Sequence, residues 1–333
     1  MFASFITFIS VFLFLCATVV WFVCWVVARF CHHAMPFAYT GLGIVVLFLA
    51  IMFYGYRFGR FQLRVQHSTY TSYKVPAAFD GYKIVHISDL HLSSLADSPA
   101  FLQRVIDSIN AQKPDLICFT GDFVGFGVEE AKPFTEMLLQ LHTKDGVVSV
   151  LGNHDFALYH YGISDAQREE KVEQLATYQR DTLGWKLLRN QSFIVARGSD
   201  TLQIIGVDNA SCKGQGFRTI YRADLPKAMQ TLASSPSRLI ASSPIKILLT
   251  HDPSHWRAEV VPNTDIPLTL SGHTHAGQVR VFGYPLSSLM FTESEGWYEM
   301  DDQHLYINTG IGCTLPVRIG VPAEITVITL KKS

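Results

Sequence analysis

The chain has 333 residues, enough for one large domain and an additional segment, and 48% of them are hydrophobic. Its 27 Lys and Arg residues nearly balance 28 Asp and Glu residues, so charge gives no reason to expect nucleic acid as a partner. The six cysteines form no CxxC pair, which argues against a zinc knuckle or a disulfide framework.

The hydrophobic excess lies at the N-terminus. Residues 1–28 carry no charge, residues 34–56 form a second uncharged run, and Arg29 with two histidines lies between them. Each run is long enough to cross a hydrocarbon core of roughly 30 Å, which takes about 20 residues. We therefore expect residues 1–60 to form two transmembrane helices in a hairpin. A cleaved signal peptide followed by one buried helix is the weaker alternative, because no basic segment precedes the long first run.

A hairpin of this kind puts the N-terminus and the C-terminal domain on one side of a membrane. The turn holds Arg29 as its full positive charge, whereas the segment after the second run holds Arg57, Arg60, Arg64 and Lys74. The positive-inside rule then places the large domain on the cytoplasmic face. The sequence therefore predicts a multi-pass protein of the inner (cytoplasmic) membrane with its large domain in the cytoplasm.

The composition turns polar near residue 62, and we interpret residues 61–82 as a linker that leads into a domain over residues 83–333. Strands and helices then alternate along the chain. Periodicity predicts strands over 83–88, 115–119 and 147–151, and helices over 98–110, 129–141 and 165–183.

The pattern changes after residue 184. Neighbouring antiparallel strands are expected over 185–188, 192–196 and 202–207, then a helix over 223–232 and strands over 245–249, 266–270, 278–282, 303–308 and 324–330. Alternating strands and helices that end in β pairs indicate an α/β sandwich. In sheets of this class, functional side chains gather at the carboxyl ends of the strands.

Side chains that can bind metal follow five of the predicted strands. In chain order they are Asp89, His91, Asp122, Asn153, His154, His251, His273 and His275. Carboxylate, amide and imidazole groups without a thiolate suit two borderline or hard divalent ions such as Mn, Fe or Zn. One carboxylate then has to bridge two cations roughly 3.5–4 Å apart, which is the spacing of two-metal hydrolases.

These motifs, in this order, resemble the calcineurin-like metallophosphoesterase family, in particular its membrane-associated bacterial branch. The matching blocks are Asp89-Leu90-His91, Gly121-Asp122, Gly152-Asn153-His154-Asp155, His251 and Gly272-His273-Thr274-His275. The late segments 307–312 and 322–325 are also similar to that branch. The resemblance covers all but the N-terminal hairpin, and it implies a four-layer α-β-β-α metallophosphoesterase sandwich.

The resemblance also implies a role for each matching residue. The first of two divalent metal ions would be held by Asp89, His91 and His275, and the second by Asn153, His251 and His273, with Asp122 as the bridge. Two residues would be catalytic: His154 would face the phosphate, and Asp155 would orient His154. The implied reaction is in-line attack on phosphorus by a metal-bound hydroxide.

On this basis we expect a membrane-anchored enzyme that hydrolyses phosphodiester or diphosphate bonds of a phosphoester substrate, with a lipid-linked substrate as one option. Some members of the branch resemble pyrophosphatases that act on UDP-2,3-diacylglucosamine, so a lipid pyrophosphatase is one alternative. A broad phosphodiesterase with a soluble substrate is another. The alternative from a different class is a non-catalytic metal-binding membrane scaffold, against which the complete set of ligands argues.

Four features outside these motifs receive structural interpretations. His86 is expected to pack inside the first strand, while Tyr159 and His160 are candidates for the mouth of the site because they closely follow the third block. Residues 213–218 are interpreted as a solvated loop, with contact of Lys213 or Arg218 to a substrate phosphate as the alternative. The aromatic-rich segment 289–298 is interpreted as core, with a lid that admits a lipid tail as the alternative.

Overall fold

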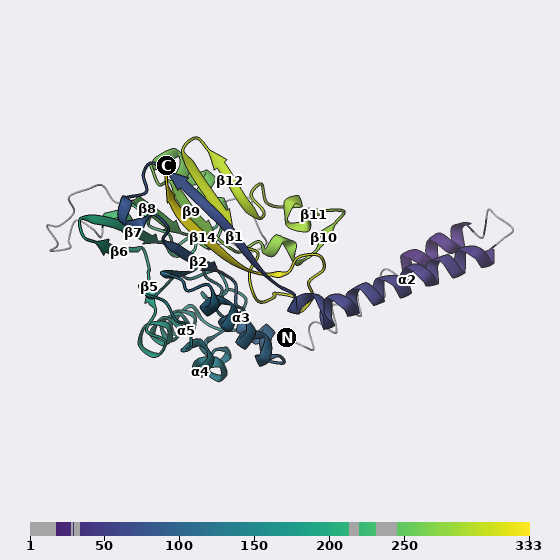
Figure 1. Cartoon of the computed structure of the whole chain (residues 1–333). Helices are drawn as coiled ribbons and strands as arrows, with labels where there is room; N and C mark the ends of the chain where they lie inside the picture. The colour runs from purple at the N-terminus through teal and green to yellow at the C-terminus, as the bar shows by residue number, and fades with distance from the viewer. Residues whose placement is uncertain (1–17, 28, 30–33, 213–219, 231–244) are drawn as a thin grey trace.

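The computed structural model describes residues 18–27, 29, 34–212, 220–230 and 245–333 (Figure 1). Two six-stranded sheets form the centre of the domain. The first sheet contains, in spatial order, β1 (Leu63–Ser72), β14 (Ala323–Lys332), β2 (Lys83–Ile87), β3 (Leu116–Phe119), β4 (Val147–Ser149) and β5 (Lys186–Leu187). The second contains β12 (Gly296–Met300), β13 (Gln303–Ile307), β9 (Leu268–Ser271), β8 (Ile245–Leu249), β7 (Asp200–Gly206) and β6 (Gln191–Arg197).

Side chains that alternate along the central strands build three separate cores, because successive residues of a strand face opposite sides of the sheet. Val85 and Ile117 pack against the helices α3 (Pro99–Ala111) and α5 (Asp165–Thr177), whereas their neighbours Ile84 and Cys118 pack between the two sheets. The outer face of the second sheet packs against α6 (Leu225–Gln230) and the helical turn at Trp256.

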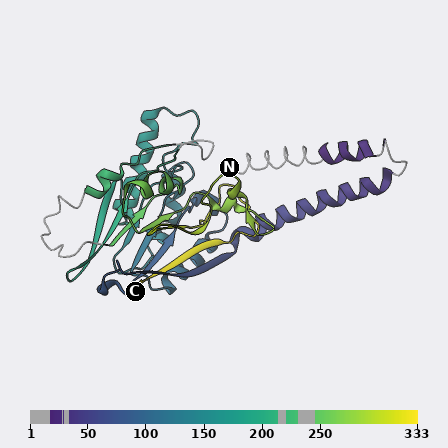
Figure 2. The same cartoon turned by 90° about the horizontal axis from the view of Figure 1, so that it is seen from above.

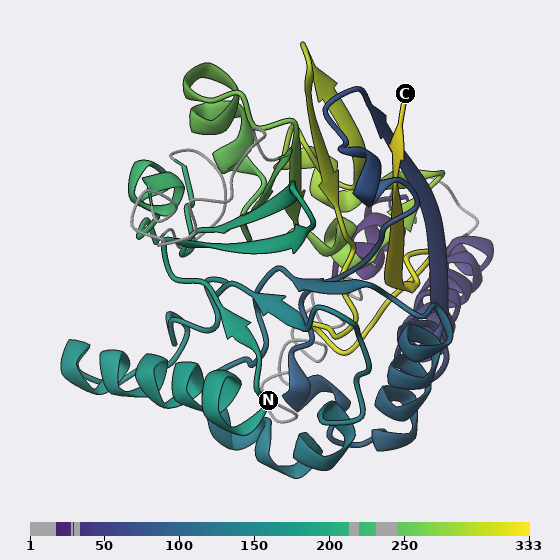
Figure 3. The same ribbon diagram turned by 60° about the vertical axis from the view of Figure 1, so that its left-hand side comes forward.

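Helices therefore cover both outer faces of the paired sheets, as Figure 3 shows. The expected α/β sandwich with α-β-β-α layers is confirmed in this arrangement of its cores.

The two long helices of the first outer layer begin where their sequences predict. Pro99 occupies the first turn of α3, a position where its missing N–H group costs nothing. Ser164 and Gln167 form a reciprocal capping box at the start of α5. The helix expected over 165–183 is shorter than predicted, because α5 ends at Thr177 and a wider π-helical turn follows.

The long helix expected over residues 129–141 is wrong. The structure has two short 3-10 turns there, followed by the single turn α4 (Thr135–Leu138). Pro133 lies in the second 3-10 turn, and it lacks the N–H group that a continuous helix needs and restricts the residue before it. The apolar spacing is thus satisfied by turns that bury Phe134 and Leu138.

Two further expectations about strands are corrected. Residues 62–81 are not a simple polar linker, because β1 runs parallel to β14 over ten residue pairs from Leu63↔Ala323 to Ser72↔Lys332. β5 does not join the antiparallel strands that follow it, since it pairs in parallel with β4 in the first sheet. The antiparallel pair β6 and β7 is confirmed, and the strand expected over 278–282 is reduced to β10 (Arg280–Val281), which pairs with β11 (Tyr284–Pro285).

Among the described residues, one helix is long and apolar enough to cross a membrane by length and composition, with the candidate span Gly41–Phe61. It largely coincides with α2 (Ala34–Arg57), which leaves the domain as an extended arm (Figures 1 and 2). Only 11% of that span is buried inside the protein. A shorter helix, Thr18–Val27, lies beside α2, with Val20 against Gly41.

The expected transmembrane hairpin is therefore supported in its second helix alone. The helix Thr18–Val27 is shorter than the roughly 20 residues that a crossing requires. Residues 1–17, where the first span is expected to begin, lie outside the described residues. The multi-pass location that was based on two spans is accordingly not supported.

Candidate metal centre

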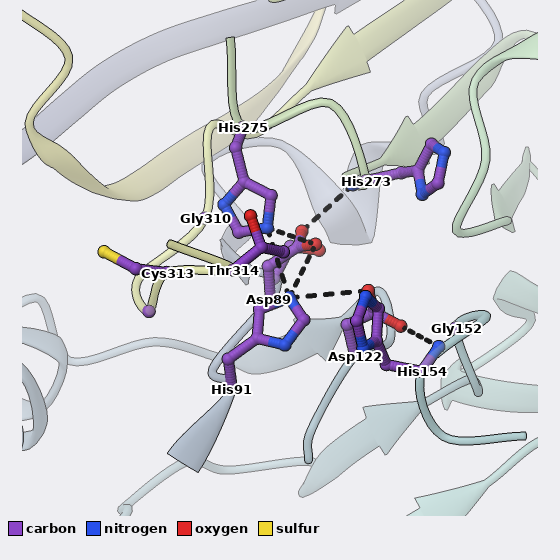
Figure 4. Close-up of polar contacts among 12 residues, drawn as sticks. Asp89, His91, Asp122, Gly152, His154, His273, His275, Gly310, Cys313 and Thr314 are labelled. Atoms are coloured by element: carbon purple, nitrogen blue, oxygen red, sulfur yellow. Dashed lines mark hydrogen bonds and ion pairs between the residues drawn. The ribbon is translucent and has the colours of Figure 1, made fainter. Parts of the chain in front are cut away.

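The predicted site residues come together at one edge of the sandwich, because both sheets end their central parallel strands at that edge. Asp89 and His91 follow β2, Asp122 follows β3, Asn153 and His154 follow β4, His251 follows β8, and His273 and His275 follow β9. Figure 4 shows the side chains of Asp89, His91 and His275 pointing toward one another, with Asp122 and His154 beside them.

The first cluster consists of Asp89, His91 and His275, whose ligand atoms all lie within 4.8 Å of one another. The Nε2 atoms of the two histidines are 3.2 Å apart, and Asp89 Oδ1 lies 3.2 Å from His275 Nε2 and 3.8 Å from His91 Nε2. In the described part of the chain, Asp89 Oδ1 is buried without a hydrogen-bond donor. Burial holds the pKa of His91 well below its usual value, which favours the neutral imidazole that binds metal.

The second cluster consists of Asp122, His251 and His273, joined by Asn153. Asn153 Oδ1 lies 3.1 Å from His251 Nε2 and 2.9 Å from His273 Nδ1. The amide nitrogen of Asn153 donates to the hydroxyl of Tyr159 at 3.2 Å, which turns its oxygen toward the histidines. His251 Nδ1 donates to a backbone carbonyl at 2.6 Å, so the opposite nitrogen faces the cluster.

Asp122 lies between the two clusters. Its Oδ2 is 3.5 Å from His91 Nε2 in the first and 3.2 Å from His251 Nε2 in the second. Although burial opposes both charges, this contact raises the pKa of His251 to about 10 and, with His154, holds the pKa of Asp122 well below its usual range. His251 must therefore release a proton before its Nε2 can bind a metal.

His154 lies at the wall of a pocket of about 320 Å³, which also reaches Asp122, His273 and His275. Its Nδ1 is 3.3 Å from a backbone carbonyl oxygen, and its ring stacks on that of Tyr159 with centroids 4.3 Å apart. These contacts define the orientation of the imidazole, and they leave Nε2 as the atom available to a substrate.

The same pocket has a second, apolar wall. It is formed by Met52 of α2 together with Met290, Phe291, Leu315 and Val317. The pocket therefore connects the polar clusters with apolar side chains at the base of α2.

Asp155 has a different environment from the one expected. Its Oδ1 accepts the N–H groups of Phe123 and Val124, and its Oδ2 accepts that of Gly152. Burial, followed by the neighbouring Asp122 carboxylate, raises the pKa of Asp155 to about 8. The expectation that Asp155 orients His154 is wrong in this geometry, because both carboxylate oxygens tie together the turns that carry the clustered residues.

The backbone at the clusters is strained. Left-handed φ values occur at Asp89 (52°), His91 (38°), Asp122 (56°), His273 (72°) and His275 (49°). Residues with a side chain rarely adopt this conformation, which costs of order 1–3 kcal/mol each and is concentrated at functional sites. The strained backbone therefore lowers the stability of the fold, and in this conformation the five side chains converge on one site.

Two glycines of the motifs allow the close approach of the turns. A side chain on Gly152 would collide with the carboxylate of Asp122, and one on Gly272 would collide with Ser88 and Asp89. The motif glycines are therefore required by the packing of the site as well as by their own turns.

Sequence reasoning missed Arg318, which is fully buried beside the first cluster. Its Nη2 lies 2.9, 3.0 and 2.6 Å from the carbonyl oxygens of Thr309, Gly310 and Gly312, and 3.3 Å from Nδ1 of His275. These contacts hold the loop that packs on the first cluster. A single arginine outside every metal-binding motif carries no sequence pattern that would have revealed this role.

Replacing Arg318 with Leu is expected to lower the free energy of unfolding by about 3 kcal/mol, because buried carbonyl groups left without a donor cost about 1–3 kcal/mol each. Arg197→Leu is the matched control, since its partly exposed pair with Asp145 is expected to contribute about 1 kcal/mol or less. Thermal and urea unfolding of the two variants in detergent would measure this difference. Equal destabilisation would contradict the role assigned to Arg318.

The remaining expectations for single residues have mixed outcomes. His86 is buried, with Nε2 2.9 Å from the hydroxyl of Thr120, and burial lowers its pKa to about 3, so its packing role is confirmed. Tyr159 lines the pocket, as proposed for the mouth of the site. The loop 213–218 lies outside the described residues.

The interpretation of segment 289–298 as core is wrong for its first part. Leu289 is 83% exposed and Met290 is also exposed, whereas Phe291 is buried against His273. Trp297 lies on the edge strand β12 and is partly exposed.

Comparisons with known proteins agree on one family. A family model described as calcineurin-like phosphoesterase matches residues 82–277. The uncharacterized metallophosphoesterase YkuE of Bacillus subtilis is 32% identical over 84% of this chain and 91% of its own length. The UDP-2,3-diacylglucosamine pyrophosphatase LpxG of Chlamydia trachomatis is 29% identical over 79% of this chain and 88% of its own length.

A transmembrane protein with a metallophosphoesterase domain from Danio rerio is 29% identical over 78% of this chain. The match covers 55% of that relative, so this chain spans about half of its length.

Proposed function

The chain belongs to the calcineurin-like phosphoesterase family, and from this premise we propose that it is a two-metal phosphodiesterase or pyrophosphatase held at a membrane by α2. Members of this family are metal-dependent phosphoric ester hydrolases, and the chain is a hydrolase of this class.

One observation carries the two-metal proposal. The single carboxylate oxygen Oδ2 of Asp122 lies within 3.5 Å of a histidine nitrogen in each cluster, as a bridging ligand requires. Asp89, His91 and His275 would hold the first metal, and Asn153, His251 and His273 would hold the second. The buried Asp89 Oδ1, with no hydrogen-bond donor among the described residues, supports this fit. So does the convergence of imidazole, amide and carboxylate groups, which suits borderline divalent ions such as Mn, Fe or Zn.

The chain's own residues have distinct parts in the proposed reaction. When bound, a pair of divalent ions supplies Lewis acidity and lowers the pKa of a water molecule. His154, held by Tyr159 and a backbone carbonyl, points its free nitrogen at the pocket and can give a proton to the leaving oxygen. Tyr159 also fixes the orientation of the Asn153 side chain, because its hydroxyl accepts a hydrogen bond from the amide nitrogen. Asp155 keeps the two turns together and takes no direct part.

The apolar wall of the pocket supports a substrate with a lipid portion. Met52 on that wall belongs to the candidate membrane span, so the pocket opens where α2 meets the domain. LpxG, whose similarity covers 79% of this chain, is a pyrophosphatase of UDP-2,3-diacylglucosamine, a molecule with two acyl groups. We therefore favour a lipid-linked diphosphate or diester over a soluble one. Arg57 at the end of α2 and Arg60 in the turn that follows it favour a cytoplasmic domain.

The division of the chain that accompanies this proposal has three parts. Residues 1–60 provide the membrane attachment, a short connection follows, and the metallophosphoesterase domain runs to residue 333. Since β1 is an edge strand of the first sheet, we propose that the domain begins with Leu63 instead of residue 83.

The test is hydrolysis by the purified full chain in detergent or proteoliposomes, with Mn, Zn, Fe or Mg added in turn. Mono- and bis-p-nitrophenyl phosphate are compared with UDP-2,3-diacylglucosamine. Turnover of a diester or diphosphate that depends on added metal is expected. The absence of turnover with every metal and substrate, with two ions per chain still found by metal analysis, would favour the non-catalytic scaffold instead.

A further inference from the structure

One segment of the domain near the pocket is both uncharged and unusually exposed. Residues 281–292 carry no charge, and they form the β10–β11 hairpin and the helical turn η9 (Leu286–Leu289). Six large apolar side chains of this segment are exposed, and we call them the apolar patch. They are Val281, Phe282, Tyr284, Leu286, Leu289 and Met290.

The tip of the hairpin presents its aromatic ring at a conformational cost. Phe282 and Gly283 connect β10 to β11 and have φ values of 50° and 88°. Both central residues of this kind of turn need positive φ, a position that favours Asn or Gly over a bulky side chain. Phe282 is nevertheless 96% exposed, so its ring gains no packing inside the domain that would offset the strain. A contact outside the domain would offset this cost.

The apolar patch is tied to the base of α2. A side chain on Gly55 of α2 would collide with Val317 and Ile319, so the helix lies directly on that segment. The N–H of Arg280, at the start of the hairpin, donates to the carbonyl of Ile319 at 2.8 Å. Figures 1 and 2 show the hairpin beside the base of α2, on the side of the domain from which the helix leaves.

The place of Gly55 along α2 indicates how deep the apolar patch would lie relative to a bilayer. Gly55 lies in the last third of the candidate span Gly41–Phe61, among Tyr54, Tyr56 and Arg57. Aromatic and basic residues of this kind mark the interface between lipid and water. The patch is therefore at the height of the lipid headgroups whenever α2 crosses a bilayer.

The charge of the patch also indicates its partner. Arg280 is the nearest cation along the chain, and its Nη2 is paired with Glu295 at 2.6 Å. The surface is thus apolar and neutral, which suits acyl chains better than an acidic peptide or a nucleic acid. Aromatic and aliphatic side chains on a rigid hairpin are well suited to the boundary between headgroups and acyl chains.

We propose that the apolar patch is a second membrane contact, which inserts into the leaflet where α2 emerges and holds the mouth of the pocket against the lipid surface. Because Met290 and Met52 both line the pocket, a lipid-linked substrate would pass from the bilayer to the metal centre along apolar side chains. The membrane contact itself rests on α2 being inserted in a bilayer. Only its consequence for the substrate rests on the proposed function.

The experiment places tryptophan in the patch of the full chain, as Phe282→Trp and Leu289→Trp in separate variants. Tyr73→Trp is the matched control, because Tyr73 is 71% exposed and follows the end of β1, a ten-residue strand that starts near the base of α2. Each protein is reconstituted into phosphatidylcholine–phosphatidylglycerol vesicles with or without brominated acyl chains. Emission is compared with that of the wild-type chain in the same vesicles.

A blue shift of the added emission at 282 and 289, and its loss in brominated vesicles, are expected. The emission added at 73 should show neither. Equal and unquenched emission at all three positions would overturn the proposal. A blue shift without quenching that grows with protein density would also overturn it, since the patch would then bind a second copy of the chain. Neither readout depends on turnover, so failure here is distinguishable from failure of the proposed activity.

Discussion

Asp122→Asn is expected to abolish metal-dependent turnover, with a loss of about 10³-fold or more. Removing one group that stabilises developing charge in an active site already costs roughly 10²–10³-fold, and the Asp122 carboxylate lies close to a histidine nitrogen of each cluster. The neutral amide nearly matches the carboxylate in shape, so its Oδ1 can still accept the N–H of His154. What is lost is the negative charge that a bridge between two cations requires.

The measurement combines initial rates on a diester with metal analysis of the purified variant. We expect fewer than two ions per chain and a weaker rise in melting temperature when Mn or Zn is added, because a ligand stabilises the folded state by mass action. Asp208→Asn is the control, since Asp208 is a buried carboxylate paired with Arg189 outside the metal clusters. It should lower stability while metal content and turnover persist. An Asp122→Asn variant with normal metal content and rate would exclude the bridge.

His154→Ala is expected to reduce turnover by about 10²–10⁴-fold, the usual contribution of a positioned proton donor, and to leave the metal content unchanged. The imidazole is held by its stacking on Tyr159 and by a backbone carbonyl, without being required for either ligand set. The loss should be smaller for p-nitrophenyl esters than for alkyl esters, because p-nitrophenolate leaves without needing a proton. A role limited to packing would give no such dependence on the leaving group.

The outcome that would reassign His154 is a loss of metal. Its ligand atom also lies close to those of His91 and Asp122, so a direct metal bond is a geometric alternative. His142→Ala serves as control, because His142 is exposed and belongs to none of the motifs. Rates and metal content equal to those of the unmodified chain are expected for it.

Much of the candidate centre could be predicted from sequence because its information is local. A buried strand, a tight turn and a ligand within a few residues recur after β2, β3, β4, β8 and β9. Parallel strands that end at one edge then bring the candidate ligands together, so no additional long-range sequence signal is needed. The layers were predictable for a similar reason, since alternation along a strand assigns each residue to a core.

The neighbours of the ligands were less predictable. Asp155 follows His154 directly, and the sequence suggested a bond between them. The folded turns instead offer three backbone N–H groups to its carboxylate, which satisfy both oxygens. Which of several nearby partners wins depends on turn geometry that a motif does not encode.

By itself, the sequence determined the types of candidate ligands, their order at strand ends, the apolar N-terminal segment and the family. The tertiary structure alone decided that β1 pairs with β14 at the far end of the chain, that Arg318 supports the first cluster, and that the patch around Phe282 is exposed beside α2. The physical reason is the separation along the chain over which each interaction acts. Periodicity and turns act over a few residues, whereas these three features depend on contacts between distant segments, whose closure is set by the packing of the whole domain.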